Sequence, residues 1–162
     1  MNDDMYDTAQ VCLSGHRITD MYETRPEHRQ EFCTTCGQKT IIACANCGAK
    51  LRGQLRDDDW AGLRRYSLPA YCRACGKPYP WTEAGLRAAR ELADELDELS
   101  AHEREQLKLS LEDLVSDSPR SGLAVVRFKK LVAKAGQEAA QAMKQILVSL
   151  VTEAVRYQIW PG

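Results

Sequence analysis

The sequence lacks the features that mark secreted, membrane-spanning and phosphate-binding proteins. None of its apolar runs approaches the roughly 18 residues that span a membrane. The opening residues, MNDDMYDTAQ, are polar and acidic, so we expect no secretory leader and a cytoplasmic location. No glycine-rich phosphate loop occurs, and no nucleophile pattern accompanies His28 or His102. We therefore expect a protein that is not an enzyme.

The net charge is low, at -1, but it conceals a strong asymmetry along the chain. Residues 1–81 carry 11 Lys/Arg and 10 Asp/Glu, residues 82–119 carry 4 and 11, and residues 120–162 carry 7 and 2. The simplest interpretation is that the acidic and basic stretches neutralise each other within the fold or between subunits. The alternative is a basic C-terminal segment that binds nucleic acid or anionic lipid.

Cysteine is what the sequence does have, and all seven cysteines precede residue 76. In a reducing compartment such cysteines are more often metal ligands or redox groups than disulfides. Six of them form three C-x-x-C-G units, CTTCGQK from Cys33, CANCGAK from Cys44 and CRACGKP from Cys72. Glycine after the second cysteine allows a positive φ, so the backbone can turn and direct its N–H groups at sulfur. We call these units the three knuckles.

The spacing predicts two zinc sites, because each knuckle supplies two of the four ligands that a tetrahedral zinc ion needs. The second site takes both ligand pairs from knuckles, and the first combines a knuckle with a C-x-x-x-H pair in which Gly15 permits the turn. The ligands of the first site are Cys12, His16, Cys33 and Cys36, and those of the second are Cys44, Cys47, Cys72 and Cys75. Two alternatives remain open: a crossed pairing of the knuckles, and His28 in place of His16.

Both sites are expected to be structural, because catalytic zinc keeps one coordination position open and these ligand sets fill all four. A thioredoxin-like redox role would need an unliganded thiolate in a βαβ pattern, which is absent. Residues 1–81 contain few large apolar side chains, so metal binding of about 10–16 kcal/mol per site would supply their folding free energy. Without metal, this half should unfold.

The composition changes near residues 78–82, where cysteines give way to helix formers. We predict a small α+β fold, with tandem zinc ribbons (short, metal-clipped β-hairpins) in residues 1–81 and a helical region in residues 82–162. Apolar periodicity predicts helices at about 83–98, 101–116, 120–135 and 137–158. Thr82 can cap the first, and Ser100 with Glu103 forms a capping box for the second. Whether Gly136 separates the last two helices stays open.

Several short motifs spread over the chain are specific. They are MYDTAQVCL at residues 5–13, GH at 15–16, FC at 32–33, CG at 36–37, CGKPYPWT at 75–82 and RFKK at 127–130. These motifs resemble those of a bacterial family, domain of unknown function 2321. The resemblance extends over nearly the whole chain, and all eight predicted ligand positions agree with it. It implies a bacterial protein that contains zinc ribbons, and it implies no activity.

We therefore expect a non-enzymatic binding or assembly module that acts through a protein partner or self-association. The first alternative is nucleic-acid binding, because aromatic and arginine residues alternate around the last two knuckles. These residues are Trp60, Tyr66, Tyr71 and Trp81 with Arg52, Arg56, Arg64, Arg65 and Arg73. The simpler interpretation is that these aromatic rings pack and the arginines are solvated. The second alternative is an effector whose C-terminal helix meets a membrane, although that helix lacks a basic face.

Overall fold

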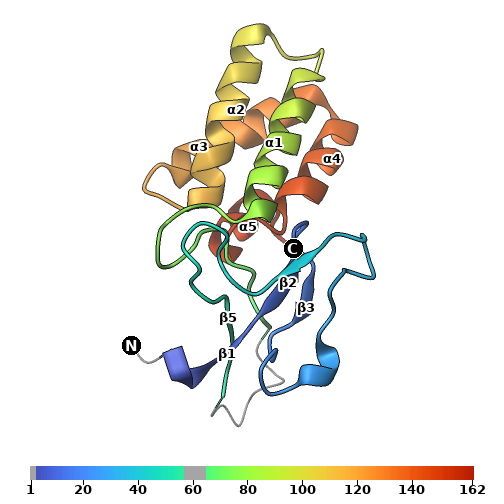
Figure 1. Cartoon of the computed structure of the whole chain (residues 1–162). Coiled ribbons are helices and arrows are strands. Elements are labelled where there is room, and N and C mark those ends of the chain that lie inside the picture. The colour runs from blue at the N-terminus through green and yellow to red at the C-terminus, as the bar shows by residue number, and fades with distance from the viewer. Residues whose placement is uncertain (1–2, 57–64) are drawn as a thin grey trace. The chain divides into compact units, whose positions relative to one another are not determined.

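The computed structural model describes residues 3–56 and 65–162, and the chain divides into two compact units, Met1–Trp81 and Thr82–Gly162. In the described part of the chain, the first unit contains the β-strands and every cysteine, and the second is helical (Figure 1). The protein is therefore small α+β, with short antiparallel strands and two cysteine clusters before the helices, in agreement with the predicted fold class.

Short antiparallel strands form two small sheets in the first unit. The elements are β1 (Tyr6–Thr8), β2 (Gln10–Cys12), β3 (Arg17–Thr19), β4 (Thr40–Ile41) and β5 (Arg52–Leu55), with 3-10 turns at Asp3–Met5 and Pro26–His28. β1 pairs with β5, and β2 lies between β3 and β4. Strands of two to four residues do not make a sheet that is stable alone. Other interactions must hold this unit together.

One of these interactions is a buried carboxylate that joins β1 to the segment after β3. Asp7 is only 3% exposed. Its oxygens accept hydrogen bonds of 2.5–3.1 Å from the N–H groups of Thr8, Glu23 and Thr24 and from the Thr24 hydroxyl. Burial alone would raise the pKa of Asp7, but these donors outweigh it and lower the pKa. The ionised carboxylate thus fixes residues 23–24 against β1.

A second such contact is a close approach of backbone to backbone at Gly53. A Cβ atom at this position would lie 2.1 Å from the carbonyl oxygen of Asp20 and 2.9 Å from the carbonyl carbon of Thr8. The N–H of Gln54 donates to the same Asp20 oxygen at 2.9 Å. Because both obstructing atoms belong to the main chain, a side chain at position 53 would separate β5 from its neighbours.

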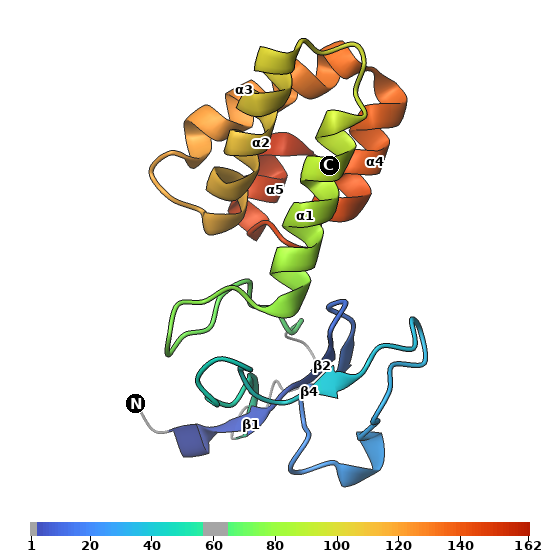
Figure 2. The ribbon, with the colours of Figure 1, turned by 45° about the horizontal axis from the view of Figure 1, so that its top comes forward.

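The helical unit is built around α3. The helices of the described residues are α1 (Pro80–Asp94), α2 (Ala101–Ser116), α3 (Ser121–Ala135), α4 (Gln137–Leu147) and α5 (Glu153–Ile159). α3 contacts α2, α4 and α5, and α1 lies alongside α4 in both views (Figures 1 and 2). Phe128 of α3, Leu111 of α2 and Met143 of α4 are at most 2% exposed and form part of one apolar core.

The first two helices follow the predicted pattern with one shift. α1 begins at Pro80 rather than at about residue 83. Proline suits the first position of a helix, because a backbone N–H there would have no hydrogen-bond acceptor within the helix. Thr82, expected to cap this helix, lies inside it and is fully buried. α1 also ends earlier than predicted, at Asp94, and a turn then buries Leu96 and Leu99.

The capping box at the start of α2 is confirmed. The Ser100 hydroxyl accepts from the Glu103 N–H at 3.2 Å, and the Glu103 carboxylate accepts from the Ser100 N–H at 2.9 Å. The leucines that recur at helical spacing, Leu107, Leu111 and Leu114, are all buried. The sequence pattern of this helix was therefore sufficient to define both its start and its buried face.

The predicted helix over residues 137–158 is wrong as a single element. Gly136 separates α3 from α4 with a φ of 104°, and α4 ends at Leu147. Thr152 then caps α5 by accepting from the Val155 N–H at 3.3 Å. The break leaves Ala154 at the surface and buries Val155 instead. A short polar cap, rather than the apolar periodicity, decides where the helix resumes.

The apolar side chains of the last two helices face the protein core. The buried residues of α4, of α5 and of the link between them are Ala139, Met143, Leu147, Leu150, Val151, Val155 and Ile159. Among the described residues, no helix combines the length and the apolar character needed to cross a membrane.

Ion pairs connect the acidic stretch to the basic stretch at two points within the helical unit. Lys134 of α3 pairs with Glu103 of α2 at 2.7 Å, and Arg120 pairs with Asp113 at 3.1 Å. Both pairs are largely exposed, so each contributes little to stability, of the order of 0–1 kcal/mol. They nevertheless agree with mutual neutralisation inside the fold.

Candidate metal centres

The three knuckles have nearly the same backbone geometry. In each, the N–H of the glycine donates to the carbonyl oxygen of the first cysteine at 2.8 Å, and that glycine has a φ of 72–74°. These pairs are Gly37 with Cys33, Gly48 with Cys44 and Gly76 with Cys72. An isolated antiparallel bridge flanks each knuckle. The predicted role of the glycines is confirmed, since only a residue that tolerates positive φ makes this turn without strain.

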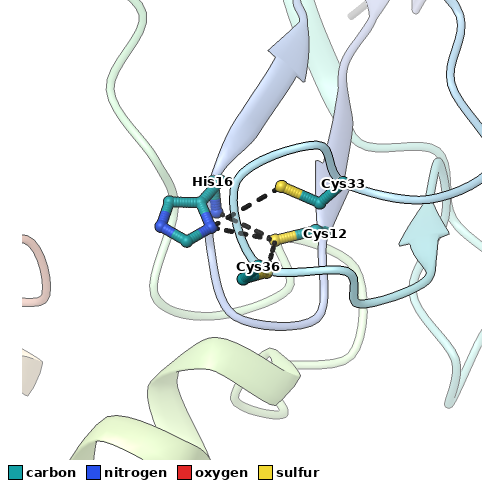
Figure 3. Close-up of side chains that lie close together, drawn as sticks. All are labelled: Cys12, His16, Cys33 and Cys36. Carbon is teal, nitrogen blue, oxygen red and sulfur yellow. Dashed lines mark hydrogen bonds between the residues drawn. The ribbon is translucent and has the colours of Figure 1, made fainter.

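The first centre joins the loop between β2 and β3 to the first knuckle. Cys12 ends β2 and His16 precedes β3, and they meet Cys33 and Cys36 (Figure 3). The Cys12 sulfur lies 3.5 Å from Nδ1 of His16 and 3.7 Å from the Cys36 sulfur, and the Cys33 sulfur lies 3.7 Å from the same Nδ1. All four ligand atoms fall within 4.8 Å of one another.

The orientation of His16 determines which ring nitrogen takes part. Nδ1 faces the sulfurs (Figure 3), so this atom is the one placed to bind a metal ion. The backbone N–H of His16 also donates to the Cys12 sulfur at 3.2 Å. His28, the alternative ligand, lies in the 3-10 turn Pro26–His28 and belongs to neither cluster.

The second centre brings the last two knuckles together across 24 residues of sequence. The sulfurs of Cys44 and Cys75 lie 3.8 Å apart, and those of Cys47 and Cys72 lie 3.6 Å apart. All four sulfurs fall within 4.8 Å of one another. The structure therefore groups the knuckles as the sequence predicts, and the crossed pairing does not occur.

The separations match the edges of a coordination tetrahedron. Sulfurs bound to a tetrahedral ion at about 2.3 Å lie about 3.8 Å apart, and a sulfur and a nitrogen lie about 3.6 Å apart. The pairs measured in the two clusters span 3.5–3.8 Å. Among the described residues, these two clusters are the groups of His, Cys, Asp and Glu arranged to hold a metal ion.

Two of the thiols are already biased towards the thiolate that metals bind. The pKa of Cys36 falls to about 6, chiefly because the Gln38 N–H donates to its sulfur. At Cys72, burial opposes ionisation, but the N–H groups of Cys75 and Ala74 donate to the sulfur and the pKa also falls to about 6. The first and third knuckles thus each contain one thiol that ionises more readily than a free cysteine.

Two aromatic side chains after the third knuckle contact both centres, a role that the sequence did not reveal. Tyr79 is 3% exposed, and its pKa is raised by burial and by the neighbouring Cys72 sulfur. Its ring stacks on Trp81 at 4.7 Å. A Cβ atom on Gly15, in the loop of the first centre, would lie 3.0 Å from the Cβ of Trp81. The PYPW motif, residues 78–81, therefore bridges the two clusters.

The predicted aromatic and arginine residues separate into two groups. Tyr66, Tyr71, Arg52, Arg65 and Arg73 line one cavity of the first unit. Arg56 instead pairs with Glu23, and Trp81 donates from Nε1 to the Pro69 carbonyl oxygen at 2.8 Å. Trp60 and Arg64 lie outside the described residues.

Comparison with known proteins gives a family but no characterised relative. The model of the family described as "Uncharacterized protein conserved in bacteria (DUF2321)" matches residues 5–159, which include both units and all eight clustered ligands. Neither the comparison with curated proteins nor that with solved structures gives a match.

Proposed function

The chain belongs to the DUF2321 family, and we propose that it is a non-enzymatic binding module whose first unit is organised by two structural zinc ions. The observation that carries this proposal is that each cluster brings four ligand atoms within 4.8 Å of one another, with sulfur–sulfur and sulfur–nitrogen distances of 3.5–3.8 Å. Zinc with four protein ligands has no position left for water or substrate, which catalytic zinc requires. The metal would therefore stabilise the fold and take no part in chemistry.

Zinc fits these ligands better than other common metals. Thiolate and imidazole ligands in a tetrahedral arrangement are typical of zinc, whereas oxygen ligands suit magnesium and calcium. The need for metal follows from the small core of this unit. Besides cysteines, its large buried side chains are Val11, Leu51, Tyr79 and Trp81 in the described residues. Seven free cysteines also support a reducing, cytoplasmic location.

Elemental analysis and native mass spectrometry should find two zinc ions per chain, and one in the variant Cys12→Ser. Cobalt substituted for zinc should show the absorption of tetrahedral thiolate coordination, and added azide should leave that spectrum unchanged because no position is open. Iron in place of zinc would contradict the choice of metal. A cobalt spectrum that responds to azide would contradict the structural role.

We further propose that the helical unit recognises protein, either a partner or a second copy of the chain. Leu123 and Val126 are 47% and 65% exposed, and their spacing of three residues puts them on one face of α3. Exposed apolar side chains that share a helix face are candidates for contacts between proteins.

Sedimentation over a range of concentrations and cross-linking in bacterial lysate test this contact. Val126→Glu should abolish the self-association or the cross-linked complex, because it buries a charge in the proposed interface. Gln145→Glu places the same charge on an exposed position of α4 and should have no effect. A strictly monomeric protein that yields no Val126-dependent complex would rule the proposal out.

A further inference from the structure

The first unit contains a cavity of about 370 Å³ that involves none of the metal ligands. Its walls come from β1, β5, residues 65–69 and the chain on either side of Cys72. Small-molecule sites typically measure about 300–1,000 Å³ and are largely apolar with a few placed polar groups. The cavity lies at the small end of that range, which suits a ligand the size of a mononucleotide.

Tyrosine rings make up much of the wall. Four tyrosines contribute rings, Tyr6 from β1 and Tyr66, Tyr71 and Tyr79 from the stretch around the third knuckle. The Tyr66 hydroxyl is buried and has no hydrogen-bond partner among the described residues. Burial raises the pKa of Tyr66 to about 12, so the group is neutral. Neutral rings of this kind stack with flat aromatic ligands.

Three arginines line the same cavity and make it locally positive. Arg52 and Arg73 both reach one carboxylate oxygen of Asp3, at 3.2 and 2.8 Å, so their guanidinium groups converge on a single anionic atom. Asp3 itself lines a neighbouring hollow, and the two hollows share Tyr6, Arg52 and Arg73, so this point lies at the edge of the cavity. Arg65 has no ion-pair partner in the described part of the chain. The one carboxylate in the wall, Asp20, is paired with Arg17 at 3.2 Å.

We propose that this cavity binds a planar aromatic ring that carries a phosphate group, as in a mononucleotide, either free or as one unit of single-stranded nucleic acid. The ring would stack on the tyrosines, and the phosphate would replace the Asp3 carboxylate between Arg52 and Arg73, with Arg65 free to contribute. Asp3 is 63% exposed, so its ion pairs are weak and displacement costs little. The inference rests on the proposed function in one respect, since the second centre holds Tyr71 and Arg73 in place.

Titration calorimetry on the full-length, zinc-loaded protein tests the site with adenosine monophosphate as the probe. Adenosine lacks the phosphate group and ribose 5-phosphate lacks the aromatic ring, so each should bind more weakly than adenosine monophosphate. Arg65→Ala and Arg73→Ala should each weaken binding by about tenfold or more, because each removes a charged hydrogen bond. Tyr66→Ala should also weaken binding, because it removes one of the stacking rings. Arg25→Ala, outside the cavity, is the matched control.

Asp3→Asn provides a gain-of-affinity test. Removing the competing carboxylate should strengthen binding by up to about fivefold, which a merely structural role for Asp3 does not predict. A single-stranded adenosine hexanucleotide identifies the source of the ligand: binding over tenfold tighter than the monophosphate indicates nucleic acid, and equal binding indicates a free nucleotide.

Zinc measured on the same samples separates this inference from the proposed function. Protein with two zinc ions that binds neither the monophosphate nor the hexanucleotide would overturn the inference alone. The same holds if binding persists in Arg65→Ala and Arg73→Ala with zinc retained.

Discussion

Removing the bound metal with a strong chelator is expected to unfold the Met1–Trp81 unit and to leave α2 and α3 folded. Strands of two to four residues and a handful of buried apolar side chains cannot offset the entropy of ordering this unit. A structural zinc site contributes about 10–16 kcal/mol of apparent binding energy, which is as large as the whole stability of a typical domain. Hydrogen exchange followed by mass spectrometry should show rapid exchange in the first unit only.

A single ligand substitution should have the same effect at one centre. Cys44→Ser removes a thiolate from the second cluster, so peptides around both of its knuckles should lose protection and one zinc ion should be lost. Ala45→Ser introduces the same side chain at the adjacent exposed position and should keep both ions. If the amide protons of the first unit stay protected after chelation, metal does not stabilise this fold.

Phe128→Ala is expected to destabilise the helical unit by about 3–5 kcal/mol, because it leaves a cavity where α3 packs. Phe128 is 2% exposed, and its ring makes a T-shaped contact with Trp160, with the ring centroids 6.1 Å apart. That loss is a large part of the roughly 5–15 kcal/mol by which a domain is stable. Urea denaturation followed by the helical circular dichroism signal measures it.

Val126→Ala on the same helix is the matched control for this cavity. Val126 is 65% exposed, so its truncation should change the free energy of unfolding by no more than about 0.5 kcal/mol. Zinc content should stay at the wild-type value in both variants, because α3 supplies no ligand. If Phe128→Ala lowers the free energy of unfolding by less than about 1 kcal/mol, the surrounding side chains have repacked to fill the cavity.

The knuckles show why so much of the candidate site was predictable from sequence. Both ligands of a knuckle and the glycine that shapes it lie within five residues, so the geometry is encoded locally. Cys44 and Cys72 illustrate this, since their N–H groups donate to the carbonyl oxygens of Ala49 and Lys77 at nearly equal distances, 2.9 and 2.8 Å. The capping box at Ser100 was predictable for the same reason.

Features that depend on distant residues were not predictable. Nothing near Asp7 in the sequence indicates that its carboxylate accepts hydrogen bonds from the N–H groups of Glu23 and Thr24. Nothing near Gly53 indicates that the carbonyl group of Asp20 lies against it. The end of α4 was missed for a related reason. The apolar residues of the segment 147–151 continue a helical pattern, but burial in the tertiary structure and the Thr152 cap decide its path.

The ligands of the two centres do not interleave along the chain, since one set lies within residues 12–36 and the other within residues 44–75. A nascent chain leaving the ribosome would thus expose every group of the first centre before any group of the second. Closing such short loops costs little entropy, so the first ion can be captured while synthesis continues. Trp81 emerges last and then covers the Gly15 turn, completing a unit assembled in the order of its translation.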